Sequence, residues 1–223
     1  MRKIQNSVSM MCADFLNLQQ ELELFSKFDV DYLHVDIMDG YYVPNVTLGS
    51  DYCKKLKIAS PIPLDIHFMV AEIDRFLPYF DLTDSLVSFH PETSRHPLRT
   101  IETIRSSGGS PGIAIDPAYD ITHYTYMLDS VDFVLIMSVN PGYAGQKLIP
   151  SAMKKIQLLR ELLDKEGLSS VKIEVDGNVS WENIPIMLDA GSDILVTGTS
   201  SIFSKEVSRE ETFTRFNTLI SKF

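Results

Sequence analysis

The chain has 223 residues, of which 44% are hydrophobic and 22% are charged, a composition typical of one globular domain with a large buried core. Thirty acidic residues against twenty basic ones give a formal net charge of −10 at pH 7, which disfavours binding to nucleic acid or to an anionic membrane. The sequence contains no uncharged apolar run of about 18 residues, and its first residues lack the apolar stretch of a signal peptide. We therefore expect a cytoplasmic protein.

Short β-branched or apolar runs alternate with longer amphipathic stretches along the whole chain, which predicts strands joined by crossover helices in a parallel sheet. The expected strands are Ser7–Met11, Tyr32–Ile37, Pro63–Phe68, Ser85–Phe89, Pro111–Ile115, Phe133–Met137, Lys172–Val175 and Ile194–Thr197. The expected helices lie near Asp14–Phe28, Ser50–Leu56, Ile73–Tyr79, Pro97–Ser106, Ile121–Leu128, Pro150–Lys165, Trp181–Ala190 and Arg209–Ser221.

Eight such strand–helix units predict one α/β domain over residues 1–223, a single (β/α)8 TIM barrel. No Ser/Gly-rich linker or block of like charge divides the chain, which favours one domain. An open doubly wound sheet is the alternative. Its first strand–helix turn would carry Gly-x-Gly-x-x-Gly, which this chain lacks there, and eight evenly spaced units favour closure.

Polar side chains are concentrated at the ends of the expected strands, where a barrel places its active site. In the second strand His34, Asp36 and Met38 alternate, so they point to the same side. In the third strand His67 and Met69 share one face for the same reason. The seventh strand adds a carboxylate from the run Glu174-Val175-Asp176-Gly177-Asn178, almost opposite the third strand in an eight-stranded ring.

Two imidazoles and two carboxylates can thus converge. Such a set suits a divalent ion such as zinc, iron(II), cobalt or manganese, because the carboxylates balance its two charges. A single His-x-Asp pair on a strand is more often a local hydrogen-bonded pair, so the hypothesis of a metal site depends on its recurrence at three strand ends.

Seven motifs occur together in one order along nearly the whole chain. They are Ser9–Asp14, His34–Asn45, Asp65–Val70, His90–Glu92, Asn140–Gln146, Val175–Gly177 and Gly198–Phe203. In these segments the chain resembles the ribulose-phosphate 3-epimerase family. The resemblance implies a barrel of the ribulose-phosphate binding type, an isomerase of the pentose phosphate pathway that interconverts D-ribulose 5-phosphate and D-xylulose 5-phosphate with one divalent metal ion. We also expect a homo-oligomer.

Residue by residue, the resemblance implies a metal-ligand set of His34, Asp36, His67 and Asp176. It further implies that the two carboxylates are the acid/base pair, and that Ser9, His67 and Asp176 contact the substrate. Met38, Met69 and Met137 match family positions that face the site. Their polarizable thioethers would exclude water without adding a competing base.

Turns after the sixth, seventh and eighth strands are the candidate phosphate site, because many barrels bind phosphate on backbone amides there. The substrate-binding candidates in these turns are Gly142, Ala144, Gly145, Gly177, Asn178, Gly198, Thr199 and Ser200. We expect the loop Asn140–Gln146 to close over the substrate as a lid. Many family members carry glycine where Ala144 and Asn178 stand, which makes the chain more similar to the allulose-6-phosphate 3-epimerase branch. Pentose and hexose substrates both stay open.

Epimerisation at C3, next to the C2 ketone, removes an α proton and leaves an enediolate, which a metal ion stabilises as a Lewis acid. One carboxylate on each face of this planar intermediate lets the proton return to the opposite face. A phosphate-binding barrel decarboxylase is a competing hypothesis, but methionine at Met38 replaces the lysine of its Asp-x-Lys-x-x-Asp motif. A non-catalytic sugar-phosphate sensor is a third, and the intact ligand set argues against it.

Overall fold

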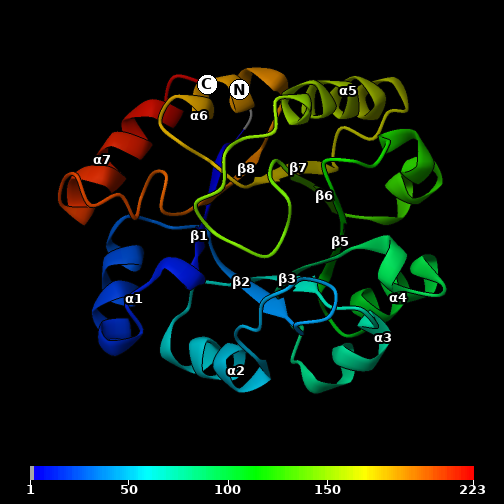
Figure 1. The fold of residues 1–223 in the computed structure, drawn as a ribbon, viewed down its shortest axis with the longest axis horizontal. Coiled ribbons are helices and arrows are strands. Elements are labelled where there is room, and N and C mark those ends of the chain that lie inside the picture. The colour runs from blue at the N-terminus through cyan, green and yellow to red at the C-terminus, as the bar shows by residue number, and fades with distance from the viewer. Residues whose placement is uncertain (1–2) are drawn as a thin grey trace.

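The computed structural model describes residues 3–223, in which eight parallel strands close a barrel in the order β1 to β8. Helices and 3-10 segments connect successive strands and surround them in a ring (Figure 1). The predicted (β/α)8 barrel is therefore confirmed. No helix within these residues is long and apolar enough to cross a membrane.

The elements have the following bounds. The strands are β1 Gln5–Ser9, β2 Tyr32–Met38, β3 Leu64–Met69, β4 Leu86–Phe89, β5 Ser110–Ile115, β6 Phe133–Met137, β7 Lys172–Asp176 and β8 Ile194–Thr197. The α-helices are α1 Leu18–Lys27, α2 Ser50–Ala59, α3 Ile73–Phe76, α4 Pro97–Ser106, α5 Ser151–Lys165, α6 Asn183–Ala190 and α7 Arg209–Ile220. The 3-10 segments are η1 Met10–Cys12, η2 Phe15–Asn17, η3 Leu77–Tyr79, η4 Pro91–Thr93 and η5 Ile121–Ser130.

Several elements differ from the prediction in type or bounds; the expected helix Ile73–Tyr79, for example, is the short helix α3 followed by the 3-10 segment η3. The first strand ends at Ser9, two residues early, because the chain turns into η1 at Met10. The crossover after β5 was expected to be a helix over Ile121–Leu128 and is a 3-10 segment, Ile121–Ser130. Its β-branched and aromatic residues have low helix propensity, and the Asp120 carboxylate, which accepts the Thr122 N–H, fixes its start.

The register between strands divides the barrel interior into two halves. Along β1, β2 and β3, Ser9 pairs with His34, and Asp36 pairs with His67, so polar side chains lie side by side. The other half of the interior is an apolar cluster of Leu86, Ala114, Phe133, Leu135, Met137 and Ile194. The polar side chains of β1 to β3 therefore lie together on one side of the barrel interior, where Glu174 and Asp176 of β7 can face them.

Candidate metal and catalytic site

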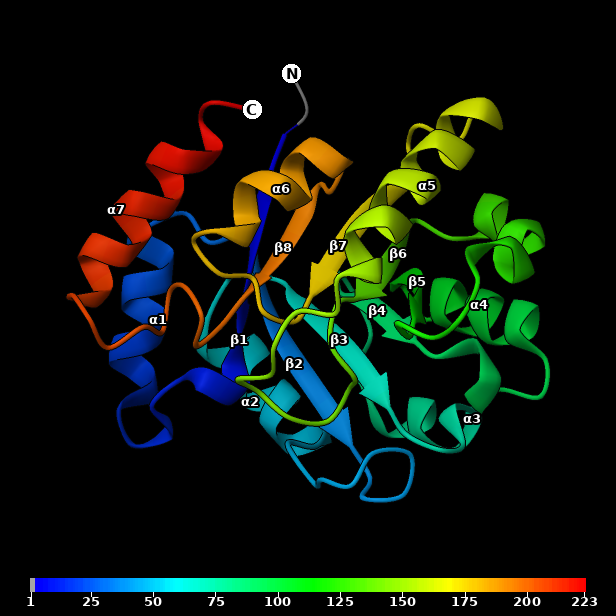
Figure 2. The ribbon, with the colours of Figure 1, turned by 45° about the horizontal axis from the view of Figure 1, so that its top comes forward.

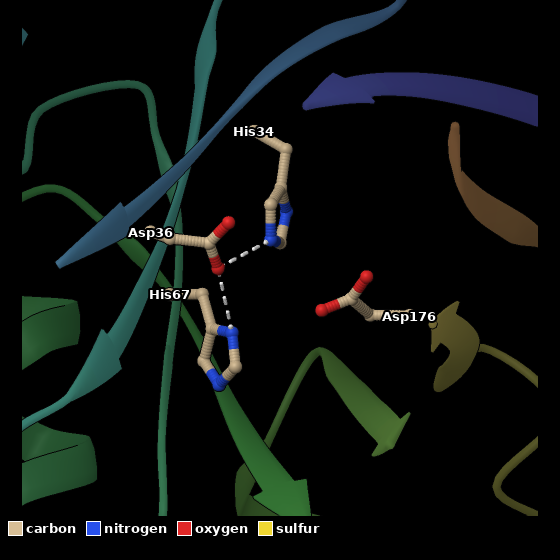
Figure 3. A group of neighbouring side chains, drawn as sticks. All are labelled: His34, Asp36, His67 and Asp176. Carbon is tan, nitrogen blue, oxygen red and sulfur yellow. Dashed lines mark hydrogen bonds and ion pairs between the residues drawn. The ribbon is translucent and has the colours of Figure 1, made fainter. Parts of the chain in front are cut away.

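Two histidines and two carboxylates meet at the carboxyl ends of β2, β3 and β7. Ligand atoms of His34, Asp36, His67 and Asp176 all lie within 4.8 Å of one another. Figure 3 shows Asp36 between the two imidazole rings, with Asp176 facing them from across the opening. The structure thus brings together the four residues that the resemblance names as ligands. Two nitrogen and two carboxylate donors with this spacing fit a divalent transition metal.

Asp36 is paired with both imidazoles. Its Oδ1 lies 3.2 Å from Nε2 of His34 and 3.3 Å from Nδ1 of His67. Burial disfavours the charged carboxylate, but the two histidines outweigh this effect and lower the pKa of Asp36. Burial also lowers the pKa of His67, against the attraction of Asp36. In the metal-free protein at neutral pH, an ionised Asp36 therefore faces a neutral His67.

Asp176 has no such partner and is partly exposed in the pocket. Removal from bulk water raises the pKa of Asp176 to about 6, against the opposing effect of the charge on His34. The two carboxylates therefore differ in the same pocket. Asp36 is ionised throughout the physiological range, whereas Asp176 exchanges a proton close to neutrality.

Beneath His34 lies a second, fully buried polar layer. The Asp65 Oδ2 atom is 2.5 Å from Nδ1 of His34 and accepts a hydrogen bond from the Ser7 hydroxyl at 2.7 Å. The neighbouring Glu174 is a neutral acid, since burial and the charge of Asp65 raise its pKa well above the ordinary value. A carboxylate on the remote nitrogen of a metal-ligating histidine fixes the ring and its tautomer. Here it leaves Nε2 of His34 to face the centre of the site.

Asp65 was not among the residues predicted from the sequence, although a pattern could have revealed it. Asp65 alternates with His67 and Met69 along β3 and so shares their inward face. The pairing of β2 with β3 then places Asp65 opposite His34. His90, which follows β4 and lies against His67, was likewise not predicted to take part in the site.

One pocket at the mouth of the barrel contains nearly all of the expected substrate contacts. Those that line it are Ser9, Met38, Met69, Met137, Gly142, Ala144, Gly145, Asp176, Gly177, Asn178, Gly198, Thr199 and Ser200. Asp36 lines the same pocket. The exception is His67, which is fully buried and lies outside the lining. The pocket therefore joins the His/Asp cluster to the turns after β6, β7 and β8.

Comparison with known proteins decides the family. The model of the ribulose-phosphate 3 epimerase family matches residues 5–203. The chain belongs to this family. The ribulose-phosphate 3-epimerase of Bacillus subtilis is 36% identical over 198 residues, which are 88% of this chain and 91% of that protein. The ribulose-phosphate 3-epimerase of Helicobacter pylori is 40% identical over 199 residues, which are 89% of this chain and 90% of that protein. The predicted membership of this family of isomerases is confirmed.

Solved structures show how widely the barrel itself is shared. Phosphoribosyl anthranilate isomerase from Thermus thermophilus aligns with a TM-score of 0.62 and 13% identity, over 97% of this chain and 100% of that chain. A variant of the tryptophan synthase α-subunit from Pyrococcus furiosus aligns with a TM-score of 0.67 and 14% identity, over 99% and 100%. At these identities the likeness concerns the fold alone.

In this epimerase-family chain, the loop between β6 and α5 crosses the mouth of the barrel (Figure 2). The Tyr143 hydroxyl donates to the Pro44 carbonyl at 2.5 Å, and the Asn45 amide donates to the Gly142 carbonyl at 2.9 Å. These two bonds join the loop after β6 to the loop after β2, on the far side of the pocket. The expected lid segment is thus in a closed position in the structure, and its movement stays a prediction.

The turn after β7 contains one required glycine and one unusual asparagine. Gly177 has φ +106°, and a Cβ there would lie 2.5 Å from the Val139 side chain, so only glycine fits. Asn178 has φ 43°, a conformation that asparagine tolerates. Its amide donates to the Gln146 carbonyl at 2.7 Å and accepts from the Asn183 amide at 2.8 Å. The Asn178 side chain therefore ties the turn to the lid loop.

Proposed function

We propose that the chain is a metal-dependent 3-epimerase of a phosphorylated ketose, with D-ribulose 5-phosphate and D-xylulose 5-phosphate as its substrate pair. The observation that carries this proposal is the pair of carboxylates, Asp36 and Asp176, that face each other across one pocket beside two buried histidines. The names of the relatives, which are ribulose-phosphate 3-epimerases, support the same substrate pair.

His34, Asp36, His67 and Asp176 would bind the metal ion, one of zinc, iron(II), manganese or cobalt. When bound, the ion supplies Lewis-acid stabilisation to negative charge on the oxygens of the substrate. The carboxylates offset the positive charge of the ion, fully when both are ionised and by half when one of them carries the proton to be transferred. Asp65 keeps the His34 ring in place through the 2.5 Å contact described above.

The two carboxylates would act on opposite faces of the substrate. One removes the C3 proton as a base, and the other, in its protonated form, returns a proton to the opposite face. In the metal-free protein, burial raises the pKa of Asp176 to about 6, which opposes the lowering that a bound cation would cause and so favours proton exchange near neutral pH. Met38, Met69 and Met137 line the pocket between them and exclude water without offering a competing base.

The phosphate group would lie among the turns after β6, β7 and β8. Gly177 and the segment Gly198–Ser200 line the pocket there, and the turns can present backbone N–H groups to an anion. This part of the pocket lies opposite β2 and β3, so the phosphate is kept away from the ionised Asp36. D-Allulose 6-phosphate is the second candidate substrate, because Ala144 and Asn178 give the same turns side chains where many family members have glycine.

The decisive experiment follows the C3 proton directly. Purified protein loaded with zinc, manganese or cobalt is incubated in D2O with ribulose 5-phosphate and, separately, with allulose 6-phosphate, and deuterium at C3 is measured together with the epimer formed. Incorporation should require the metal and should be lost in Asp176→Asn. Metal-loaded protein that exchanges C3 of neither substrate would contradict the proposal. The homo-oligomeric state and the cytoplasmic location stay predictions.

A further inference from the structure

A third histidine lies directly behind His67. His90 follows the last residue of β4 and is fully buried. Its Nε2 atom lies 3.0 Å from Nε2 of His67, whose other nitrogen, Nδ1, faces Asp36. The two imidazole rings therefore form a line from Asp36 into the protein interior, and neither ring lines the pocket.

A carboxylate lies at the far end of this line. The Oδ1 atom of Asp116 is 3.1 Å from Nδ1 of His90, whereas the nearer oxygen of Glu92 is 3.9 Å away and accepts the Tyr42 hydroxyl instead. Neither Nδ1 of His90 nor Oδ1 of Asp116 has a hydrogen-bond partner among residues 3–223, so their 3.1 Å contact is an ion-pair distance without the alignment of a hydrogen bond. Lys155 on α5 donates to the backbone carbonyl of Asp116 at 2.6 Å, which fixes this end of β5. Nδ1 of His90 and Oδ1 of Asp116 therefore lie next to each other in the interior, and each is the polar atom within reach of the other.

The number of protons on the two imidazoles decides which nitrogen donates and which accepts between His67 and His90. A neutral imidazole has one N–H and one lone pair. If His67 binds a metal ion through Nδ1, its proton must be on Nε2, and at 3.0 Å that N–H can only be donated to Nε2 of His90. The proton of His90 is then on Nδ1, where it faces the carboxylate of Asp116. The opposite direction would place a proton on Nδ1 of His67 and prevent metal binding.

We propose that His90 and Asp116 are positioning residues that keep His67 in the tautomer that presents Nδ1 to the metal ion. This inference rests on the metal site of the proposed function. On this proposal both histidine ligands, His34 and His67, are oriented by a carboxylate. At His34 the carboxylate of Asp65 makes the contact itself, whereas at His67 the carboxylate acts through a second imidazole ring.

The same count of protons decides the role of a neighbouring cluster. His90, Glu92 and Asp116 have ligand atoms within 4.8 Å of one another and could by geometry bind a cation of their own. A metal ion there would need the lone pair on Nδ1 of His90, which carries the proton when His67 is a ligand. Metal binding at the first site therefore excludes a second ion at this cluster.

The direct test is the position of the protons in the zinc-loaded protein. Long-range ¹H–¹⁵N spectra of the histidine rings distinguish a protonated, an unprotonated and a metal-bound nitrogen. The expected result is a zinc-bound Nδ1 and a protonated Nε2 for His67, with a protonated Nδ1 for His90. Zinc on Nε2 of His67, or a proton on Nε2 of His90, would overturn the proposal. No substitution is needed, so the test does not depend on the folding of a variant.

Variants supply a second test, read as zinc affinity by competition with a chelator. His90→Phe removes the acceptor and should weaken binding by about 10- to 100-fold, the usual effect of losing such a partner. His90→Gln, which keeps an amide oxygen as an acceptor, should restore most of the affinity. Asp116→Ala should weaken binding more than Asp116→Asn, which keeps an oxygen, and Glu92→Gln is the matched control that should match the wild type.

The outcomes separate this inference from the function on which it rests. Wild-type protein that binds no zinc through His34 and His67 would refute the metal site itself. Wild-type protein that binds zinc there, with equal affinity in folded His90→Phe, would refute only the positioning role. An effect of Glu92→Gln as large as that of Asp116→Ala would assign the acceptor to the wrong carboxylate and overturn the proposal as stated.

Discussion

The two sides of the pocket are built from different parts of the chain. On the side of β2 and β3, side chains form the site. Asp36 lies between two buried imidazoles, of which one contacts Asp65 and the other contacts His90. On the side of β6, β7 and β8, the lining consists largely of backbone turns, and Asp176 has no ion-pair partner within residues 3–223. On the first side, the two histidines keep Asp36 ionised and in a fixed position. On the second side, Asp176 can gain or lose a proton near neutral pH.

The largest expected effect tests whether both carboxylates are needed. Asp36→Asn and Asp176→Asn should each lower the rate of epimerisation by about 10²- to 10⁴-fold, because each removes one acid/base group. Asp36→Asn should also lower metal content more than Asp176→Asn does, since it weakens the contact between Asp36 and both imidazoles. Steady-state rates with metal analysis of each variant measure both effects. Near-normal turnover in either variant with its metal bound would contradict the two-carboxylate mechanism.

A second substitution examines the buried layer on the imidazole side. Asp65→Ala should lower zinc affinity by about 10- to 100-fold, since it removes the carboxylate that orients His34. Glu174→Gln is the matched control. Its affinity should stay close to that of the wild type, because the raised pKa already makes Glu174 neutral. Equal affinities in folded Asp65→Ala and Glu174→Gln would show that the layer only fills space.

The pH dependence of metal uptake distinguishes the two sides in one titration. Burial disfavours a charged His34, but Asp65 and Asp36 outweigh it and raise the pKa of His34 well above 6.5, so metal-free His34 is protonated at neutral pH. Zinc binding at pH 7.5 should therefore release about one proton. Below about pH 6, Asp176 is protonated as well, and release should rise toward about two.

Since each released proton makes binding weaker as pH falls, zinc affinity should decrease with acidification and should do so more steeply below pH 6. Calorimetry in buffers of different ionisation enthalpy measures the number of protons. Asp176→Asn supplies the control, because it should remove the steeper part of the curve. Proton release that is independent of pH between 5 and 8 would be inconsistent with these pKa shifts.

The smallest expected effect concerns the turn side. Asn178→Gly removes the hydrogen bond to the Gln146 carbonyl, which contributes about 0.5–1.5 kcal/mol, so amide exchange in the lid loop should become about 2- to 12-fold faster. The ratio of kcat/KM for pentose and hexose phosphates, compared with that of the wild type, shows whether the residue also affects substrate choice. Unchanged exchange and unchanged kinetics would leave Asn178 only its place in a left-handed turn.

Local patterns in the sequence predicted the barrel and the convergence at its mouth. Alternation along two strands placed His34 with Asp36, and closure of the ring brought the end of β7 opposite them. The line from His67 to Asp116 could not be read in the same way. It depends on the orientation of His90 just beyond the end of β4, and on side-chain distances that no strand period specifies. The fifth crossover was predicted at the right place with the wrong helical type, because its hydrophobic spacing suggested an α-helix although its β-branched and aromatic residues have low helix propensity.

The two hydrogen bonds between the loops after β2 and β6 have a kinetic consequence. Both end on backbone carbonyls, at Pro44 and Gly142, and together they favour the closed arrangement by about 1–3 kcal/mol. If the loops must part to admit substrate, the pocket would be open for only a small fraction of the time, and the apparent affinity for substrate would be reduced by that fraction. We then expect kcat to fall as solvent viscosity rises, because each turnover would wait for the loops to part.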